Sequence, residues 1–372
     1  MKKKLFFLIH TLGGGGAEKA LVNLVNHLDT SKYDITVETM FDDGINAKSL
    51  KPHIHYISKK APCPKGISKL LKLIPAKVLY RYFVGNKQYD VLIAYMHGAP
   101  VKVISGNHSA KKIAWLHNGN PETSTMFAPW FSQKKAINTY NTYNAIVGVC
   151  RSVADAFSQY TGIAEKVKVV YNTLEVDSIL ELAHQDIPFS FSNRQINLVS
   201  TGRLGKEKGY ARLIDVCEQL KNEHYPIKLF LIGTGSEENN LKVQIHDRSL
   251  ENEVELLGYQ ENPYQYVDKC NIFICSSFTE GLSTATIEAL ILGKAIVSTN
   301  VSGAKEILGD SEYGIVVDNS ENGIKQGIKL FLDNTEMIDK YGERARSHSF
   351  TFSVDNTVKQ AERLLDEVLN KE

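Results

Sequence analysis

The sequence predicts an α/β protein made of two doubly wound domains, each with a parallel sheet covered by helices. Short apolar runs typical of buried strands alternate with amphipathic segments typical of helices along most of the chain. The alternation breaks over about 174–195, where Pro188 and a stretch of Phe, Ser and Asn residues indicate a linker. Because 372 residues also suit two domains of ordinary size, we place one domain at 1–188 and the other at 189–353.

The first domain is predicted to open on a strand rather than on a secretion signal. Residues 4–10 contain only five consecutive apolar residues and are soon followed by a glycine run, which disfavours a signal peptide. No stretch elsewhere approaches the ~20 apolar residues that span a bilayer. A helix is predicted over about 17–28, and further strands at 35–39, 91–94, 113–116, 145–149 and 168–171.

The second domain repeats this pattern. A helix over about 210–220 follows its first strand, and a final helix is predicted over 354–370. Ligands of open parallel sheets bind outside the carboxyl ends of the strands, so the loops that follow the strands are the places to search for a site. The predicted strands are 196–202, 228–233, 254–257, 271–275, 295–298 and 314–317.

The composition is ordinary for a globular enzyme, with 43% apolar and 23% charged residues. The five cysteines form no Cys-x-x-Cys pair, which argues against a disulfide scaffold and a zinc site and favours a reducing cytoplasm. The net charge of +1 hides an asymmetry, because the first 120 residues hold 18 basic and only 7 acidic residues. We therefore expect the first domain to meet an anionic partner.

The most informative stretch is 276–290, which joins a buried strand to an amphipathic helix. It places Glu280 on the loop and Glu288 on the helix, eight residues apart. The unpaired amides and positive dipole end of such a helix suit a phosphate or a sugar oxygen, and carboxylates accept hydrogen bonds from hydroxyls. The sequence therefore predicts a nucleotide-sugar site, with the helix terminus at Gly281, Leu282, Ser283 and Thr284.

Two cations lie on the loop after the first strand of the second domain. Arg203 and Lys208 are five residues apart and can clamp a diphosphate, and fixed cations there stabilise the charge that develops on a departing nucleoside diphosphate. The alternative is an ordinary solvated loop. In the first domain, His117 ends a strand and can hydrogen-bond a sugar hydroxyl or the transferring centre, or serve only a structural role.

A glycine run, 13–16, separates the first strand from the first helix and lets the backbone approach an anion closely. Its spacing fails the Gly-x-Gly-x-x-Gly pattern, because Glu18 or Lys19 falls where the third glycine belongs. A nicotinamide oxidoreductase is therefore disfavoured. The other interpretation of the run is a tight turn that binds nothing.

Basic and apolar residues interleave over 65–87. Such a surface can lie on anionic lipid headgroups, and the alternative is an ordinary pair of packed helices, broken at Pro75, with lysines in water. Nucleic-acid binding is disfavoured because the basic residues form no recognised binding module. The cations are Lys65, Lys69, Lys72, Lys77, Arg81 and Lys87.

The sequence contains no Asp-x-Asp pair, since Asp42 and Asp43 are adjacent, and no cluster of His and Cys. We therefore expect no essential divalent ion and no bound cofactor. Arg203 and Lys208 are the candidates to supply the positive charge that a metal ion would otherwise provide.

Together these motifs resemble glycosyltransferase family 4, whose members are retaining enzymes of GT-B fold that use nucleotide sugars. The resemblance covers nearly the whole chain. It implies two Rossmann-like domains facing across a cleft, the first binding the acceptor and the second the donor, with a last helix, 354–372, that crosses back to the first. It is strongest over 198–318, at residues 202–204, 207–209, 231–235, 280–288 and 302–307.

The resemblance also implies a role for each site residue. Arg203 and Lys208 are expected to bind the donor diphosphate. Glu280 is expected to hold the donor sugar and Glu288 the ribose, while the backbone of 281–284 contacts the sugar or the distal phosphate. In the first domain, Gly15 and Gly16 match the glycine loop of the family, and His117 matches its acceptor-side histidine.

The predicted activity is the retaining transfer of a hexose or an N-acetylhexosamine from a nucleoside-diphosphate sugar, with a UDP-sugar favoured. The expected acceptor is a hydroxyl of a glycan or lipid-linked saccharide in the synthesis of a cell-surface polysaccharide. The expected location is the cytoplasm, with peripheral contact on the inner face of the plasma membrane. Two alternatives stay open, a nucleotide-sugar epimerase of GT-B fold and a non-catalytic sugar-nucleotide-binding protein. Product analysis without an acceptor separates the epimerase from a transferase, and donor hydrolysis or transfer would exclude the binding protein.

Overall fold

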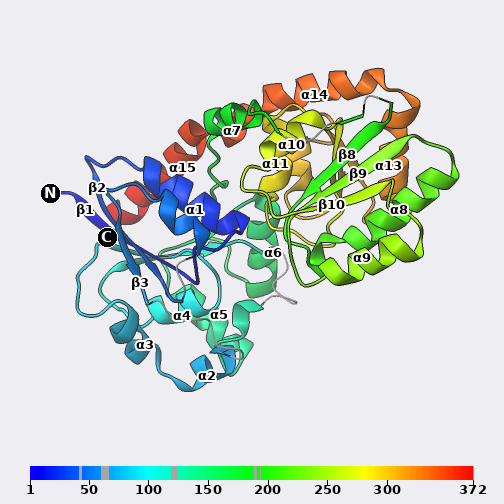
Figure 1. The fold of residues 1–372 in the computed structure, drawn as a ribbon. Helices are drawn as coiled ribbons and strands as arrows, with labels where there is room; N and C mark the ends of the chain where they lie inside the picture. Colours follow the sequence, from blue (N-terminus) through cyan, green and yellow to red (C-terminus); the bar gives the residue numbers. More distant parts are fainter. Residues whose placement is uncertain (42–43, 60–66, 119–124, 188–190, 193, 372) are drawn as a thin grey trace. The chain divides into compact units, whose positions relative to one another are not determined.

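The computed structural model describes residues 1–41, 44–59, 67–118, 125–187, 191–192 and 194–371. The chain divides into two compact units (Figure 1). The first unit contains residues 1–173 together with 354–372, and the second contains 174–353. Each unit is a parallel sheet with helices packed on it, which is the predicted α/β class.

Within the described residues, the first unit holds a seven-stranded sheet in the order β3-β2-β1-β4-β5-β6-β7. Its strands pair in parallel, and those at its centre are apolar on both faces because helices cover both sides. The strands are β1 (Lys3–Ile9), β2 (Tyr33–Thr39), β3 (His55–Ser58), β4 (Val91–Ala94), β5 (Lys111–Leu116), β6 (Ala145–Gly148) and β7 (Val167–Val169).

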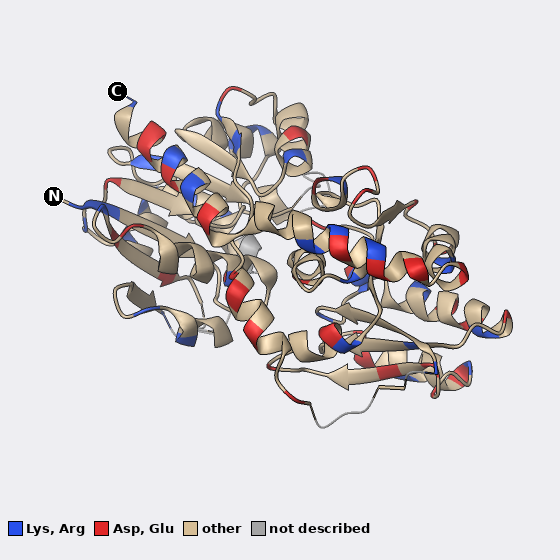
Figure 2. Cartoon of the chain, turned by 90° about the horizontal axis from the view of Figure 1, so that it is seen from above, with Lys and Arg blue, Asp and Glu red and all other residues tan. Residues whose placement is uncertain are grey.

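The helices of the first unit include the last helix of the chain, α15 (Val354–Asn370), which packs against α1 (Gly16–His27). Glu362 of α15 accepts a hydrogen bond from the backbone of Asp29 at 2.9 Å. Figure 2 shows basic and acidic positions alternating along α15, whose apolar side is buried. The other α-helices are α2 (Ile67–Leu73), α3 (Ala76–Phe83), α4 (Ala99–Ile104), α5 (Gln133–Asn141) and α6 (Arg151–Thr161).

The second unit holds a six-stranded parallel sheet, counted over the described residues, in the order β10-β9-β8-β11-β12-β13. Its core is formed by aliphatic side chains of the strands and of the helices that cover them. The strands are β8 (Ile196–Thr201), β9 (Ile227–Ile232), β10 (Val254–Gly258), β11 (Ile272–Cys275), β12 (Ala295–Thr299) and β13 (Ile315–Val317).

The helices of the second unit alternate with these strands, as the pattern predicts. Across the described residues of both units, no helix combines the length and apolar character needed to cross a bilayer. The helices are α7 (Val176–Ala183), α8 (Tyr210–Asn222), α9 (Glu238–Asp247), α10 (Tyr264–Lys269), α11 (Thr284–Ile291), α12 (Ala304–Leu308), α13 (Glu321–Asp333) and α14 (Glu336–His348).

The structure differs from the sequence-based expectation at two elements. The short strand β3 was missed, since its four residues are at most half-buried and show no apolar run. The segment 174–195 was interpreted as a linker, but it contains α7, which packs against α10 and α11 through an apolar face that includes Ile179 and Ala183.

The division between the units also falls earlier than the predicted boundary at 188/189. Contacts place it after Thr173, so the segment from Leu174 to α7 groups with the second unit. Residues 188–190, at the predicted boundary, lie outside the described part of the chain. The assignment of acceptor binding to the first domain and donor binding to the second stays a prediction.

Candidate active site

The strand order places a switch point at the centre of the second sheet, where β8 lies between β9 and β11. Connections leave these strands in opposite directions across the sheet, and ligands of open α/β sheets bind beside such a point, outside the carboxyl ends of the strands. The loop after β8 carries Arg203 and Lys208, and the loop after β11 carries Glu280. The predicted site residues of the second unit therefore flank the switch point.

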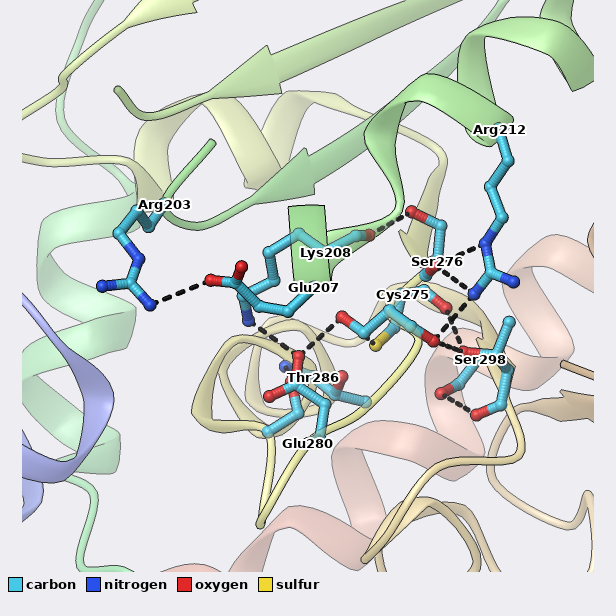
Figure 3. Close-up of polar contacts among 12 residues, drawn as sticks. Arg203, Glu207, Lys208, Arg212, Cys275, Ser276, Glu280, Thr286 and Ser298 are labelled. Atoms are coloured by element: carbon cyan, nitrogen blue, oxygen red, sulfur yellow. Dashed lines mark hydrogen bonds and ion pairs between the residues drawn. The ribbon is translucent and has the colours of Figure 1, made fainter. Parts of the chain in front are cut away.

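Lys208 and Glu280 form an ion pair at this point (Figure 3). The Nζ atom of Lys208 lies 2.7 Å from Oε1 of Glu280, and the side chains are 21% and 13% exposed. Ser277 donates a second hydrogen bond to the same oxygen at 2.6 Å. A small pocket adjoins the pair, and its lining includes Lys208, Glu280 and Ser277 together with Ser283.

Electrostatics keep the Lys208 ammonium charged. Burial by itself would lower the pKa of Lys208, but the negative charge of Glu280 outweighs burial with the help of nearby groups, so the pKa lies above its ordinary value. A permanent cation that is shielded from water interacts more strongly with an anionic ligand than a solvated cation does. The site is therefore suited to a phosphate group.

Two glycines allow the loops at the switch point to approach each other closely. Gly209 has φ +67°, and a Cβ atom there would lie 2.2 Å from the carbonyl oxygen of Ser276. A Cβ atom on Gly233 would lie 2.0 Å from the carbonyl oxygen of Gly202. The Ser276 hydroxyl donates to the Lys208 carbonyl at 2.9 Å and joins the two loops. Any larger side chain at these glycines would push the loops apart.

Helix α11 begins next to the pair, as its sequence predicts. Ser283 is its N-cap and accepts a hydrogen bond from the amide of Thr286 at 3.3 Å. Glu288, one turn further along, accepts a hydrogen bond from the Tyr264 hydroxyl at 2.9 Å. The helix terminus at 281–284 and both carboxylates thus belong to one loop-and-helix segment.

Arg203 is the predicted site residue that points elsewhere. Its guanidinium is 77% exposed at the side chain and donates to Glu207 at 2.9 Å (Figure 3). The structure thus brings Lys208 and Glu280 together and pairs Arg203 with a different carboxylate. The predicted two-cation clamp on a diphosphate stays a prediction, because an exposed arginine can change its rotamer at little cost.

Arg212 was not predicted from the sequence; it lies on α8, four residues after Lys208. It is 6% exposed and donates hydrogen bonds to the carbonyl oxygens of Ser276 and Ser277. One signal was available in the sequence, an arginine at the start of a helix between apolar core residues. Its partners, however, lie 64 and 65 residues away, and no local pattern identifies them.

In the first unit, the switch point lies where β1 separates β2 from β4. Gly15 caps α1 and Gly16 is its first residue, so the predicted glycines do form a helix terminus. His117 follows β5 directly, and its ring centroid lies 4.9 Å from that of Tyr95. The geometry assigns no ligand to these residues, and their roles stay predictions.

Three histidines follow strands of this first sheet, and burial keeps them neutral. Burial lowers the pKa of His10 and of His97 to about 4, and that of His117 to about 3. Among the described residues, Nδ1 of His97 and Nε2 of His117 are buried without a hydrogen-bond partner. Neutral imidazoles with unsatisfied nitrogens can hydrogen-bond a hydroxylated ligand at this edge.

The expectations about metal ions and the basic surface concern residues that are only partly described. No group of three or more His, Cys, Asp or Glu side chains suited to a metal ion occurs in the described ranges, and Asp42 and Asp43 lie outside them. The basic surface predicted over 65–87 is partly described, and its first cation, Lys65, lies outside the described residues.

On α2 and α3 of this surface four large apolar side chains are at least half exposed, namely Leu70, Leu73, Val78 and Tyr82.

Comparison with known proteins identifies the family. The model of Glycosyltransferase Family 4 matches residues 14–178, and the model of Glycosyl transferases group 1 matches residues 185–348. The two matches together account for most of both units. The chain belongs to the family 4 glycosyltransferases and is a glycosyltransferase of GT-B fold, which confirms the resemblance, the fold class and the enzyme class that the sequence predicts.

Similar proteins include a Campylobacter jejuni enzyme named N-acetylgalactosamine-N,N'-diacetylbacillosaminyl-diphospho-undecaprenol 4-alpha-N-acetylgalactosaminyltransferase. It is 27% identical over 365 residues, which cover 94% of this chain and 96% of the relative. A second Campylobacter jejuni enzyme, an alpha-1,4-N-acetyl-D-galactosaminyltransferase, is 23% identical over 99% of both chains. Among solved structures, Anabaena Alr3699/HepE in complex with UDP-glucose superposes with a TM-score of 0.77 at 20% identity, over 98% of this chain and 99% of that one.

Proposed function

We propose that this glycosyltransferase moves an N-acetylhexosamine or a hexose from a UDP-sugar to a hydroxyl of a glycan or lipid-linked saccharide, with retention of anomeric configuration. The observation that carries the proposal is the shielded Lys208–Glu280 pair beside the N-terminus of α11, at the switch point of the second sheet. A fixed cation suits the diphosphate, and a carboxylate suits the sugar hydroxyls.

The residues have separate roles in this proposal. Lys208 binds the diphosphate, with Arg203 turning from Glu207 to join it. Glu280 accepts hydrogen bonds from the donor sugar, and Glu288 accepts them from the ribose. The amides of 281–284 contact the sugar or the distal phosphate. In the first unit, the proposed ligand contacts are the glycine loop at Gly15 and Gly16 and the acceptor-side histidine, His117.

The chemical step breaks the bond between the anomeric carbon and the diphosphate oxygen and forms a bond from that carbon to the acceptor oxygen on the same face. The departing phosphate oxygen takes the proton of the acceptor hydroxyl, so the products are the glycoside and UDP. Lys208 stabilises the negative charge that grows on the leaving diphosphate. The step uses no separate base, metal ion or bound cofactor.

The choice of donor and acceptor rests on the relatives. The names of both Campylobacter relatives specify an α-linked N-acetylgalactosaminyl product on a lipid-diphosphate saccharide, and the Anabaena structure contains UDP-glucose. An α-linked product from an α-configured UDP-sugar corresponds to retention. These similarities favour a UDP-N-acetylhexosamine and an undecaprenyl-diphosphate saccharide as the first substrates to test.

The test is UDP release from UDP-N-acetylgalactosamine, UDP-N-acetylglucosamine, UDP-galactose and UDP-glucose, with and without an undecaprenyl-diphosphate disaccharide. We expect one donor to support acceptor-dependent UDP release, an elongated lipid product with an α linkage, and unchanged activity in excess EDTA. Interconversion of two UDP-sugars without an acceptor would identify an epimerase instead. UDP binding without any turnover would identify a non-catalytic binding protein.

We also propose that the enzyme is cytoplasmic and rests peripherally on the inner face of the plasma membrane through α2 and α3. The exposed apolar side chains Leu70, Leu73, Val78 and Tyr82 lie on the same two helices as Lys72, Lys77 and Arg81. Apolar side chains next to cations fit an anionic lipid interface, where each cation contributes ~1 kcal/mol.

Co-sedimentation with vesicles of phosphatidylglycerol and phosphatidylcholine tests this surface. Lys72→Glu combined with Lys77→Glu should weaken binding to the anionic vesicles at least ten-fold, whereas Lys134→Glu combined with Lys135→Glu on α5 should change it less than two-fold. Equal binding by both double variants would remove the proposed surface.

A further inference from the structure

We propose that Arg212 is a positioning residue of the donor site, because its guanidinium fixes the backbone of the loop that carries Glu280 in its position relative to Lys208. The inference deepens the proposed function and rests on it. No motif of the sequence marks Arg212, which is the third residue of α8, the helix that follows the Lys208 loop. Its role follows from its contacts.

The Arg212 guanidinium connects three segments of the second unit, and Figure 3 shows its hydrogen bonds to the segment at Ser276. Its Nε and Nη2 atoms donate to the carbonyl oxygen of Ser276 at 3.0 and 2.5 Å, and Nη2 donates to that of Ser277 at 2.8 Å. Nη2 also donates to the side-chain oxygen of Asn319 at 2.7 Å. The helix α8, the loop after β11 and the loop after β13 are thereby joined by one side chain.

The chemistry of these contacts is unusual for a residue that only fills space. Arg212 is 6% exposed, and its hydrogen-bond partners among the described residues are neutral oxygens rather than a carboxylate. The Phe278 ring lies under the guanidinium, with its centroid 3.8 Å away. Burying a charge is costly unless its donors are satisfied, so an apolar side chain would serve packing better.

The two residues whose carbonyls Arg212 holds also use their hydroxyls, one to contact the Glu280 carboxylate and the other to contact the backbone of Lys208. Ser277 donates to the Glu280 carboxylate at 2.6 Å, and Ser276 donates to the Lys208 carbonyl at 2.9 Å. The Ser277 carbonyl also accepts a hydrogen bond from Thr299 at 2.8 Å. A shift of this short backbone segment would move Glu280 relative to Lys208, and Arg212 opposes that shift.

A lysine cannot replace Arg212 in this role. The planar guanidinium presents several donors in a fixed fork, which is what allows one side chain to reach Ser276, Ser277 and Asn319 together. Lysine keeps the positive charge but carries a single nitrogen on a flexible stem. The substitution Arg212→Lys therefore removes the clamp and leaves the charge.

The experiment compares Arg212→Lys and Arg212→Ala with Arg248→Lys and Arg248→Ala. Arg248 is the control because it, too, bridges two partners. Its partners are the carboxylates of Asp215 and Glu218 on α8, and neither belongs to the loop after β11. For each variant we would measure kcat and KM for transfer from the UDP-sugar that the wild type uses, the melting temperature, and amide hydrogen exchange over 276–283.

We expect Arg212→Lys to lower kcat at least ten-fold and to accelerate exchange over 276–283, while both Arg248 variants stay within two-fold of the wild type. Guanidinium ion at millimolar concentration should restore at least three-fold activity to Arg212→Ala and leave Arg248→Ala unchanged. If Arg212→Ala does not fold, Arg212→Lys decides the outcome.

The proposal is overturned if Arg212→Lys has a lower melting temperature but wild-type kcat, KM and exchange rates. Failure of the proposed function has a different signature, because the wild type itself would then transfer no sugar. In that case the exchange rates over 276–283 still report whether Arg212 holds the loop, since they need no substrate.

Discussion

The Nζ atom of Lys208 lies 2.7 Å from Oε1 of Glu280, although 72 residues separate the two in the chain. The sheet topology explains this proximity. Lys208 follows β8 and Glu280 follows β11, and these strands are hydrogen-bonded neighbours whose carboxyl ends meet at the same edge. The pair is therefore a consequence of strand order, and its surroundings determine what it can bind.

Loss of the Lys208 charge should impair transfer specifically. Replacing Lys208 by Met removes the cation that stabilises the leaving diphosphate, so kcat should fall by roughly 10²- to 10³-fold, as for other groups that stabilise transition-state charge. Lys228→Met is the control, because Lys228 forms a 2.7 Å ion pair with Glu255 between β9 and β10. The control should retain transfer within two-fold in steady-state assays, and equal losses in both variants would argue against a specific role.

The close approach of the two loops should make Gly209 irreplaceable. In Gly209→Ala the methyl group meets the Ser276 carbonyl, and the left-handed backbone adds a cost of about 1–2 kcal/mol. Gly258→Ala is the control, with φ +68° but no atom within 4 Å of the added Cβ. Urea unfolding of the second unit should show a larger loss of unfolding free energy for Gly209→Ala. Equal losses would mean that the contact with Ser276 relaxes freely.

The N-cap of α11 should affect both stability and transfer. Ser283→Ala removes a cap that accepts a hydrogen bond at 3.3 Å, and the matched variant Ser132→Ala removes the cap of α5 with the same geometry. Each should reduce the unfolding free energy of its unit by about 1 kcal/mol. Only Ser283→Ala should lower kcat/KM for the donor, by at least ten-fold. Unchanged transfer by Ser283→Ala would place the ligand away from this helix terminus.

The half-buried histidines that follow strands of the first sheet should make the first unit sensitive to acid. Their folded pKa values, about 4 for His10 and His97 and about 3 for His117, lie below the ordinary value of 6.5. Between those pH values the unfolded chain binds more protons, so stability is complete above pH 6.5 and falls as the pH drops toward 4. Each histidine contributes a slope of up to about 1.4 kcal/mol per pH unit.

Urea unfolding between pH 7 and pH 4.5 measures this slope. His97→Gln should flatten the profile by about one proton, because it removes one group that binds a proton in the unfolded chain and not in the folded unit. A profile with the same slope in His97→Gln and in the wild type would show that His97 titrates normally in the folded unit.

The sequence predicted most of the fold and placed Lys208 and Glu280 on loops that the structure brings together, for physical reasons that differ between residues. Short apolar runs such as 272–275, bounded by polar residues, predict buried strands because they are too short for a typical helix. Ser283, which follows Gly281 and Leu282, predicts the start of a helix because serine is a preferred N-cap residue. The strand β3 escaped prediction because it lacks such a run, and α7 because Pro188 and the polar residues after it dominate the pattern.

The contacts that could not be predicted are those between distant segments. Arg203 and Lys208 share one loop and look equivalent in the sequence, yet only Lys208 reaches Glu280. Arg212 contacts backbone carbonyls, which every residue possesses, so no residue type in the sequence indicates its partners. Side-chain direction on a loop and hydrogen bonds to backbone atoms are set by tertiary structure.

The most direct test of the central claim is calorimetric titration of UDP and of the transferable UDP-sugar into the wild type, Lys208→Met and Glu280→Gln. A charged hydrogen bond contributes about 1.5–3 kcal/mol, so Lys208→Met should bind UDP ~10- to 100-fold more weakly. Glu280→Gln should keep wild-type affinity for UDP, because its carboxylate is assigned to the sugar, and should lose the added affinity that the sugar provides. Wild-type binding of UDP by Lys208→Met, or equal loss of UDP and UDP-sugar binding by Glu280→Gln, would contradict the account.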